Sequence, residues 1–276
     1  MPLVLVPDAM YAPSVALGQF LRPGDEGDPM HTKLTSLSAS SAFALAASLS
    51  SLCLAQSTPT TYRTSIYHLK PDMVNEWVDM EKNEVVPALK KAGVKTRNVY
   101  VTAAFGNAGE YLITQPFDNF SEFDGPNPLV RALDGPGAAR LLTKLAKCEV
   151  SVNSYENIRL LDISNVFDPP AAIVVSARYH ITAGKLPEFR ELVKSEILPV
   201  YKKAKVSLIV SQRGPGANPS DVTMVTGYTK MADMQGGPFL VQQLGQAGAD
   251  KVAAKFAGIR TLAEVVVRRR VAELSF

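Results

Sequence analysis

Apolar and polar residues along the chain follow two kinds of spacing, and each kind appears twice in the same order. Residues 62–69 and 173–181 alternate and are rich in β-branched and aromatic side chains, which predicts two strands. A helix-spaced segment follows each strand. Its apolar stripe is Val74, Trp77, Met80, Val85, Ala88 and Leu89 in the first case, and Leu186, Phe189, Leu192, Ile197, Val200 and Tyr201 in the second.

Direct identity between these segments indicates a repeat. Residues 67–94 recur at 179–206, at a constant spacing of 112 positions. The ten identical residues of the first copy are Tyr67, His68, Glu76, Lys82, Glu84, Pro87, Lys90, Lys91, Ala92 and Val94. Self-similarity at a fixed period indicates one structural unit copied along the chain. Pro87 and its copy Pro199 fall inside the helical segments, where a proline is expected to kink or split the helix.

The remaining predicted elements also agree between the two units. After each helix we expect two strands joined by a turn, then a looser helical region and a last strand. These are residues 97–105, 110–117, 120–147 and 151–161 in the first unit, and 206–212, 222–229, 231–256 and 261–271 in the second. The order β-α-β-β-α-β is that of a ferredoxin-like unit. The sequence thus predicts an α+β protein with ferredoxin-like repeats at 62–165 and 171–276.

The N-terminal residues have the pattern of a targeting segment. Residues 1–29 are proline-rich without a period, so we expect an extension without regular structure. Residues 30–55 have a short basic start, an uncharged stretch and small residues at the end, as in a signal peptide cleaved after Ala55. Translation is expected to start at Met30, with Met1 as the alternative. The mature protein would then be periplasmic or secreted, without stable membrane insertion.

Two other interpretations of this segment stand beside the signal peptide. The 22 uncharged residues from Leu34 to Ala55 could cross a bilayer as an anchor, although their many serines argue against it. A lipoprotein signal fits less well, because Leu52 rather than a small residue stands before Cys53.

Composition narrows the function classes only slightly. A net charge of +3 is too small to indicate a nucleic-acid-binding protein, and 46% hydrophobic with 20% charged residues is ordinary for globular domains. After signal cleavage Cys148 is the only cysteine, so no internal disulfide can form. Its helical spacing from Leu141 and Leu145 favours a buried packing residue over a nucleophile.

The opening of the first unit resembles a known family. The stretch from Tyr62 to Pro71, with Tyr67, Leu69 and Lys70 before the proline and Glu76-Trp77 after it, is similar to the start of NIPSNAP-type domains. Both units more broadly resemble the dimeric α+β barrel superfamily, which includes antibiotic-biosynthesis monooxygenases. The second unit departs from the motif at 182–184, where Lys-Pro is lost.

The resemblance implies a particular architecture and a range of activities. Two antiparallel sheets would face each other and enclose a barrel, here built within one chain. Members of the superfamily include oxygenases without cofactors, haem-handling enzymes and proteins with no assigned activity. The helical segments of the mature chain contain no histidine for an axial haem ligand, which counts against haem, and we expect no cofactor.

Two histidines stand at the same position in the two units. Residues 173, 175, 177, 179 and 181 form the more apolar face of their strand, which we expect helices to cover. The other face carries Ser176, Arg178 and His180, and the matching residues of the first unit are Thr64, Ile66 and His68. If the sheets pair as in the family, both histidines point into a shared interior. Candidate catalytic residues are therefore His68 and His180, and candidate ligand-binding residues are His68, His180, Arg178, Ser176 and Thr64.

A structural explanation stands beside this hypothesis, because duplication also copies histidines that merely hold a strand in place. No metal site is predicted, since catalytic zinc usually has three protein ligands and no spacing ties Glu110, Glu156 or Glu264 to the histidines. The run Arg268-Arg269-Arg270 is expected mainly at the surface, with an interior anion contact as the alternative.

Three function classes remain open. The first is an exported protein that binds a small organic molecule between the two repeats. The second is a cofactor-independent, monooxygenase-like oxidoreductase with a histidine as general base. The third is a structural or interaction module whose barrel is filled by side chains. No nucleic-acid partner is expected, and further homo-oligomerisation is left open.

Overall fold

The computed structural model describes residues 60–276, which lie within one compact unit. The expected extension at 1–29 and the expected signal peptide at 30–55 fall outside the described residues. Within the described part, no helix is both long enough and apolar enough to cross a membrane.

The first half of the described chain contains four strands and two helical regions, in the predicted order. Its elements are β1 (Thr61–Leu69), α1 (Val74–Met80), the π-helix η1 (Glu81–Val85), α2 (Val86–Lys91), β2 (Asn98–Thr102), β3 (Glu110–Pro116), the 3₁₀ turn η2 (Phe120–Phe123), α3 (Pro128–Cys148), β4 (Glu149–Arg159) and the 3₁₀ turn η3 (Leu161–Ile163).

The second half has the same order of elements. They are β5 (Ile173–Ile181), α4 (Leu186–Leu192), the π-helix η4 (Val193–Ile197), α5 (Leu198–Ala204), β6 (Leu208–Arg213), β7 (Asp221–Tyr228), the 3₁₀ turn η5 (Met231–Met234), α6 (Phe239–Lys255), β8 (Arg260–Arg270) and the 3₁₀ turn η6 (Ala272–Leu274).

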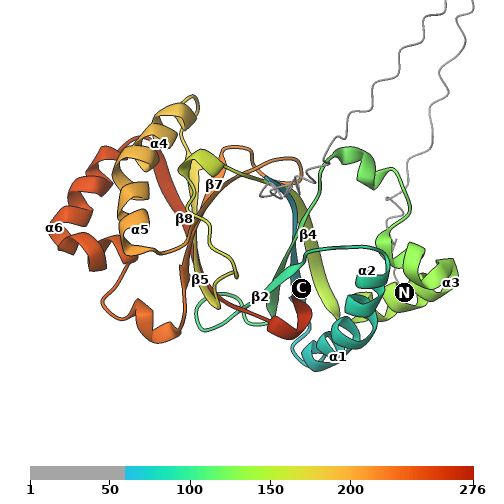
Figure 1. Ribbon diagram of the computed structural model, residues 1–276. Helices are drawn as coiled ribbons and strands as arrows, with labels where there is room; N and C mark the ends of the chain where they lie inside the picture. The colour runs from blue at the N-terminus through green and yellow to red at the C-terminus, as the bar shows by residue number, and fades with distance from the viewer. Residues whose placement is uncertain (1–59) are drawn as a thin grey trace, which may run out of the picture. The chain divides into compact units, whose positions relative to one another are not determined.

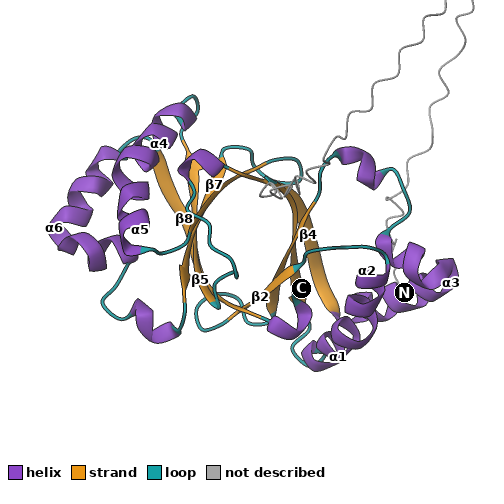
Figure 2. Ribbon diagram, viewed as in Figure 1, coloured by secondary structure: helices purple, strands orange, loops and turns teal. Residues whose placement is uncertain are grey.

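The eight strands form one closed barrel in the order β1-β3-β2-β8-β5-β7-β6-β4. Each half contributes four adjacent strands, and the halves join where β2 pairs with β8 and where β4 pairs with β6. All neighbouring strands are antiparallel, so β1 and β5, four steps apart in the ring, run in the same direction. This architecture confirms the predicted α+β class with an antiparallel barrel closed within one chain (Figures 1 and 2).

Each half packs its helices against the outer face of its own strands. The core of the first half includes Trp77, which is fully buried, and the core of the second half includes Phe189 at the equivalent position. Cys148 is also fully buried in the first core, as its helical spacing predicted. Burial raises the pKa of its thiol, which disfavours the reactive thiolate.

Each of the two proline-containing helices is interrupted near its proline, as predicted, by a five-residue π-helical turn within a continuous helix. The backbone stays right-handed helical from α1 through η1 to α2, and from α4 through η4 to α5, and Pro87 and Pro199 stand just after the π-helical turns. A proline inside a helix removes one backbone hydrogen bond, and prolines and π-helical turns are both places where a helix departs from regular geometry. The same interruption in both halves gives the two helical segments equivalent shapes.

The end of each half crosses over and completes the core of the other half. Ile163 follows β4 of the first half but is fully buried in the second core, and Leu274 follows β8 of the second half but is fully buried in the first core. Backbone hydrogen bonds hold both tails. Asn165 exchanges two with Leu208, and Phe276 exchanges two with Arg97.

Most strand boundaries differ by one or two residues from those expected. The largest strand difference is in β2, which ends at Thr102 rather than at Phe105, because the next residues already turn towards Gly106, which has a φ of 127°. The first helix begins at Val74, so Pro71 lies in the turn that precedes it.

Candidate functional site

The predicted site residues of β1 and β5 face the interior of the barrel. Tyr67 and Leu69 on β1, like Tyr179 and Ile181 on β5, pack into the helix-covered cores. Because successive side chains alternate between the faces of a strand, the intervening residues point the other way. The inward-facing set includes Thr64, Ile66 and His68 on β1 and Ser176, Arg178 and His180 on β5.

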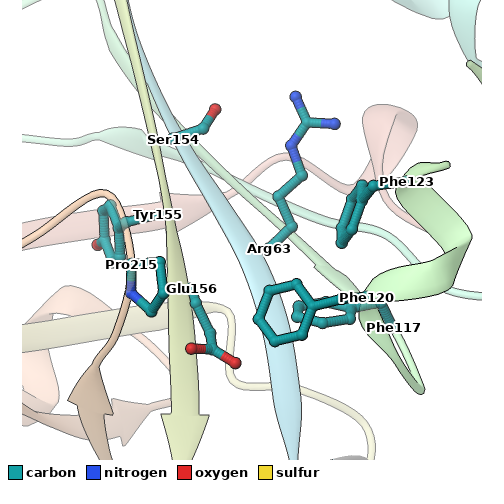
Figure 3. Close-up of a pocket in the computed structure, with 8 residues that line it drawn as sticks. All are labelled: Arg63, Phe117, Phe120, Phe123, Ser154, Tyr155, Glu156 and Pro215. Atoms are coloured by element: carbon teal, nitrogen blue, oxygen red, sulfur yellow. The ribbon is translucent and has the colours of Figure 1, made fainter. Parts of the chain in front are cut away.

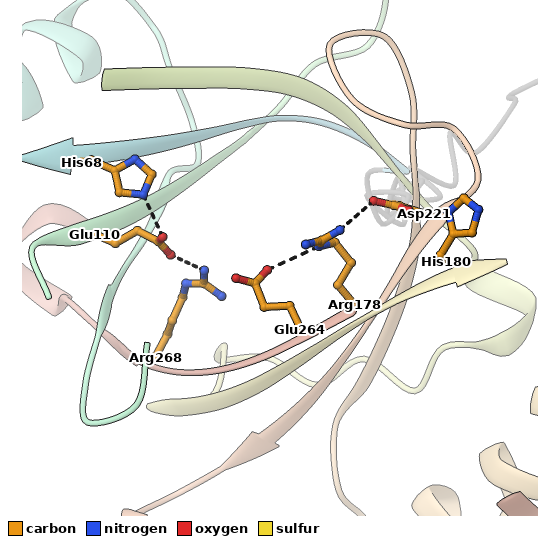
Figure 4. A network of polar contacts seen from close by, with 7 residues as sticks. All are labelled: His68, Glu110, Arg178, His180, Asp221, Glu264 and Arg268. Carbon is orange, nitrogen blue, oxygen red and sulfur yellow. Dashed lines mark hydrogen bonds and ion pairs between the residues drawn. The ribbon is translucent and has the colours of Figure 1, made fainter. Parts of the chain in front are cut away.

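Both histidines are paired with a carboxylate across the ladder. Nε2 of His68 lies 3.1 Å from Oε2 of Glu110, the first residue of β3. Nδ1 of His180 lies 3.1 Å from Oδ1 of Asp221, the first residue of β7. The two pairs are equivalent in the two halves, and Figure 4 shows them in two separate groups of polar side chains. One group contains His68, Glu110 and Arg268, and the other contains His180, Asp221, Arg178 and Glu264.

The two carboxylates are buried, and arginines compensate their charge. Glu110 and Asp221 are each 5% exposed. Arg268 of β8 donates to Glu110, which joins the second half of the chain to the first. Arg178 donates from Nη1 to Asp221 at 3.0 Å and from Nε to Glu264 at 3.3 Å. A buried carboxylate without such partners would be strongly disfavoured. The arginines therefore stabilise the two carboxylates that contact the imidazole rings.

The charge of Arg178 is secured by its two acidic partners. Burial lowers the pKa of a guanidinium, but the hydrogen bonds and charges of Asp221 and Glu264 outweigh this effect and raise the pKa of Arg178 above its ordinary value. Arg178 therefore stays cationic and holds Asp221 in place beneath His180.

The two histidines differ in the nitrogen that is left available. His68 uses both ring nitrogens, because Nδ1 lies 3.1 Å from Oγ of Ser151 and Nε2 contacts Glu110. His180 uses only Nδ1, and within residues 60–276 no group hydrogen-bonds to its Nε2. Its side chain is 52% exposed against 37% for His68. His180 is thus the imidazole better placed to exchange a proton with another molecule.

Both pairs lie at the same end of the barrel, which we call the histidine end. His68 and His180 are the next-to-last residues of β1 and β5, and these strands run in the same direction. The structure thus places the two histidines and Arg178 at the same end of the barrel, on strands that lie four positions apart in the ring. Thr64 lies deeper, four residues before His68, and its buried Oγ1 has no hydrogen-bond partner among residues 60–276. Ser176 is half-buried at the same depth on β5.

Several residues of this network were missed or misplaced from the sequence. No sequence spacing ties Glu110, Glu264 or Asp221 to the histidines. The expected surface position is wrong for Arg268, which is 5% exposed and makes the alternative contact, with an anion in the interior. A signal did exist. Glu110 and Asp221 are equivalent at a spacing of 111 positions, one less than the 112 that relates the histidines, because the second half has one residue fewer before β6.

No metal site emerges from this arrangement. Across residues 60–276, no group of three His, Cys, Asp or Glu side chains is placed to hold a metal ion. Each histidine instead has a single acidic neighbour that is already engaged with an arginine.

A hollow of about 180 Å³ lies outside the barrel interior, on the helix side of β1 and β4 (Figure 3). Its walls include Arg63, Glu156 and an aromatic group formed by Phe117, Phe120 and Phe123. The equivalent residues of the second half include Val175, Met231 and Met234, which belong to or pack against its apolar core. These side chains of the second half are thus packed against its core, whereas Phe120 and Phe123 of the first half remain 58% and 50% exposed.

Comparison with known proteins supports the fold. No family model matches the sequence, and no curated protein matches it. A candidate monooxygenase from Lactobacillus acidophilus NCFM superposes with a TM-score of 0.52 at 11% identity, covering 77% of this chain and 94% of its own. An anthrone oxidase-like protein superposes with a TM-score of 0.53 at 9% identity, covering 78% of this chain and 92% of its own. The chain thus has the ferredoxin-like α+β barrel fold found in monooxygenase-like proteins, closed here by the two halves of one polypeptide.

Proposed function

We propose that the protein is an exported binding protein for a small organic molecule, built from two fused ferredoxin-like repeats, and that the ligand enters the barrel at the histidine end. His68, His180, Arg178, Ser176 and Thr64 would line its path. The supporting observation is that each histidine contacts a buried carboxylate, and that each of these carboxylates also forms an ion pair with an arginine.

Solvent access to the inward face also supports the proposal. A solidly packed barrel would bury its inward side chains. Ser151, Asn153 and Glu264 face inward and are exposed, while Leu112 and Val225, further along the strands, are only half-buried. Solvent therefore reaches side chains on the inward face of the strands, which is what a ligand entering there would require.

The test is native mass spectrometry of the protein purified from a cell-envelope or culture fraction, together with its absorption spectrum. The wild type is compared with a His68→Ala/His180→Ala variant and with Val152→Ala as the control, because Val152 neighbours Ser151 but points outward. A co-purifying organic molecule that only the histidine variant loses would support the proposal. An empty wild type together with a merely less stable histidine variant would favour a structural module instead.

A monooxygenase-type reaction is the second candidate function. It is favoured by the unoccupied Nε2 of His180 within the described residues and by the names of the two proteins with a similar fold. His180 would accept a proton from an acidic C–H or O–H of the substrate, and Asp221 would stabilise the imidazolium. For a CH2 substrate, the resulting carbanion would reduce dioxygen and bond to it, and the peroxide would take back the proton. Loss of water from this hydroperoxide would leave a ketone, so one oxygen atom ends in the product and the other in water.

Oxygen uptake with an anthrone as probe substrate tests this second candidate. Loss of a positioned general base lowers kcat about 10²-fold to 10⁴-fold. We expect such a loss in His180→Gln and a smaller one in His68→Gln, since both nitrogens of His68 are already engaged. Uptake that is unchanged in His180→Gln would rule out this role.

A further inference from the structure

The barrel interior contains more positive than negative charge. Alternation from the ladder partners gives five inward-facing arginines, Arg159, Arg178, Arg213, Arg268 and Arg270, against three inward-facing acids, Glu110, Asp221 and Glu264. Two positive charges are therefore not balanced by carboxylates. A protein interior normally pairs its buried charges, so an unbalanced set needs an explanation.

The unbalanced charge lies mainly among arginines without acidic partners. Arg178 and Arg268 are in ion pairs, but Arg159, Arg213 and Arg270 contact no carboxylate in the described part of the chain. The Nε atoms of Arg159, Arg213, Arg268 and Arg270 are buried and have no hydrogen-bond partner among the described residues, 60–276. A buried donor left unsatisfied costs about 1–3 kcal/mol, and more when the group is charged.

Two of these arginines converge at the end of the barrel opposite the histidines, which we call the arginine end. Arg159 ends β4 next to the start of β1, where its N–H donates to Thr60, and Arg270 ends β8 next to the start of β5, where its N–H donates to Ala172. They are equivalent residues of the two halves and come from opposite sides of the ring.

Tyr100 lies within electrostatic range of both guanidinium groups. Burial raises the pKa of its hydroxyl, and the charges of Arg270 and Arg159 both oppose this rise. The guanidinium of Arg159 also lies 4.5 Å from the ring centre of Tyr62. Such stacking stabilises a cation but supplies no anion, so two positive charges share this end of the barrel without a carboxylate partner among residues 60–276.

We propose that the arginine end binds the carboxylate of an organic acid, held between Arg159 and Arg270 with Tyr100 beside it. This inference rests on the proposed ligand site in the barrel and specifies the chemical class of the ligand. The planar guanidinium fork matches a carboxylate or a phosphate, and a carboxylate on an apolar body also suits the rings of Tyr62 and Tyr100. The ligand would then reach from the arginine end towards His180.

The test uses three probes with the mature protein: benzoate, its neutral analogue benzamide, and inorganic phosphate. Binding is measured by calorimetry and by the shift in melting temperature for the wild type, Arg159→Gln and Arg270→Gln. Arg269→Gln is the matched control, because Arg269 neighbours Arg270 on β8 but faces outward and is exposed. We expect benzoate to raise the melting temperature and bind about tenfold or more weakly to either inward variant, the usual effect of a lost charge-assisted hydrogen bond.

A second readout separates an anion site from a structural role. Without ligand, Arg270→Gln relieves an unbalanced buried charge, so its melting temperature should equal or exceed that of the wild type. A marked loss of stability together with unchanged benzoate affinity would overturn the inference. So would equal binding of benzamide, or binding of phosphate but not benzoate, or no binding of any probe.

The two proposals fail in distinguishable ways. If a co-purifying neutral molecule depends on His68 and His180 but not on the arginines, the carboxylate site is refuted and the binding function stands. If benzoate binding depends on Arg159 and Arg270 while the histidine variants bind every ligand normally, the histidine end is not the entrance and the arginine site stands.

Discussion

A buried ion pair in the first half has an apolar counterpart in the second, which allows a quantitative prediction. Glu81 and Arg97 lie 2.7 Å apart and are 4% and 3% exposed. Their equivalents are Val193 and Leu208, both fully buried in the second core. Burial raises the pKa of Glu81, and the charge of Arg97 opposes this rise, so the pair is retained against a desolvation penalty.

Each single substitution should therefore destabilise the protein much more than the double substitution does. Glu81→Val or Arg97→Leu alone leaves one uncompensated buried charge, which lowers the free energy of unfolding by about 3–5 kcal/mol. The double variant removes both charges and copies the solution of the second half. Arg97 also donates from Nη1 to the carbonyl of Leu274 at 3.4 Å, a contact worth about 1 kcal/mol. We expect the double variant to lie within about 1 kcal/mol of the wild type or above it.

Urea denaturation followed by tryptophan fluorescence measures these values. Trp77 is the only tryptophan of the chain and is fully buried in the same core, so its emission reports on this region. Urea is preferable to guanidinium because it is uncharged and does not screen the pair. A double variant as unstable as the less stable single variant would mean that the packing of the two side chains, and not the balance of their charges, stabilises this core. That result would refute the prediction.

Two further predictions concern packing. Cys148 should resist alkylation in the folded protein at neutral pH, because burial raises the pKa of its thiol and keeps the thiolate scarce; rapid labelling by iodoacetamide without denaturant would contradict this. Leu274→Ala should lower the free energy of unfolding by about 2–5 kcal/mol, because Leu274 is fully buried. The control Leu262→Ala, at a 54% exposed position, should change the free energy of unfolding by less than about 1 kcal/mol in the same urea titration.

Much of the fold was predictable because it depends on local patterns. Alternation along β5 assigns its two faces correctly, since it puts Tyr179 on the helix-covered side and His180 on the opposite side. Pro87 and Pro199 mark the breaks in the helices because a proline acts on its own turn whatever surrounds it. These features need no information on long-range contacts.

The site was only partly predictable because its partners come from distant strands. His68 finds Glu110 only because β1 and β3 pair in a particular register, and Arg268 reaches Glu110 only because β2 and β8 close the barrel. The basic run at 268–270 looked like a surface feature because charged residues usually are exposed. Barrel closure reverses that expectation for Arg268, since it turns one face of β8 inward.

The crossing tails carry a consequence for how the protein unfolds. Leu274 and Phe276 complete the core and the edge of the first half, and Ile163 and Asn165 do the same for the second half. Neither half can therefore lose its own fold without also uncovering part of the core of the other half. The two halves should unfold together as one cooperative body rather than one after the other.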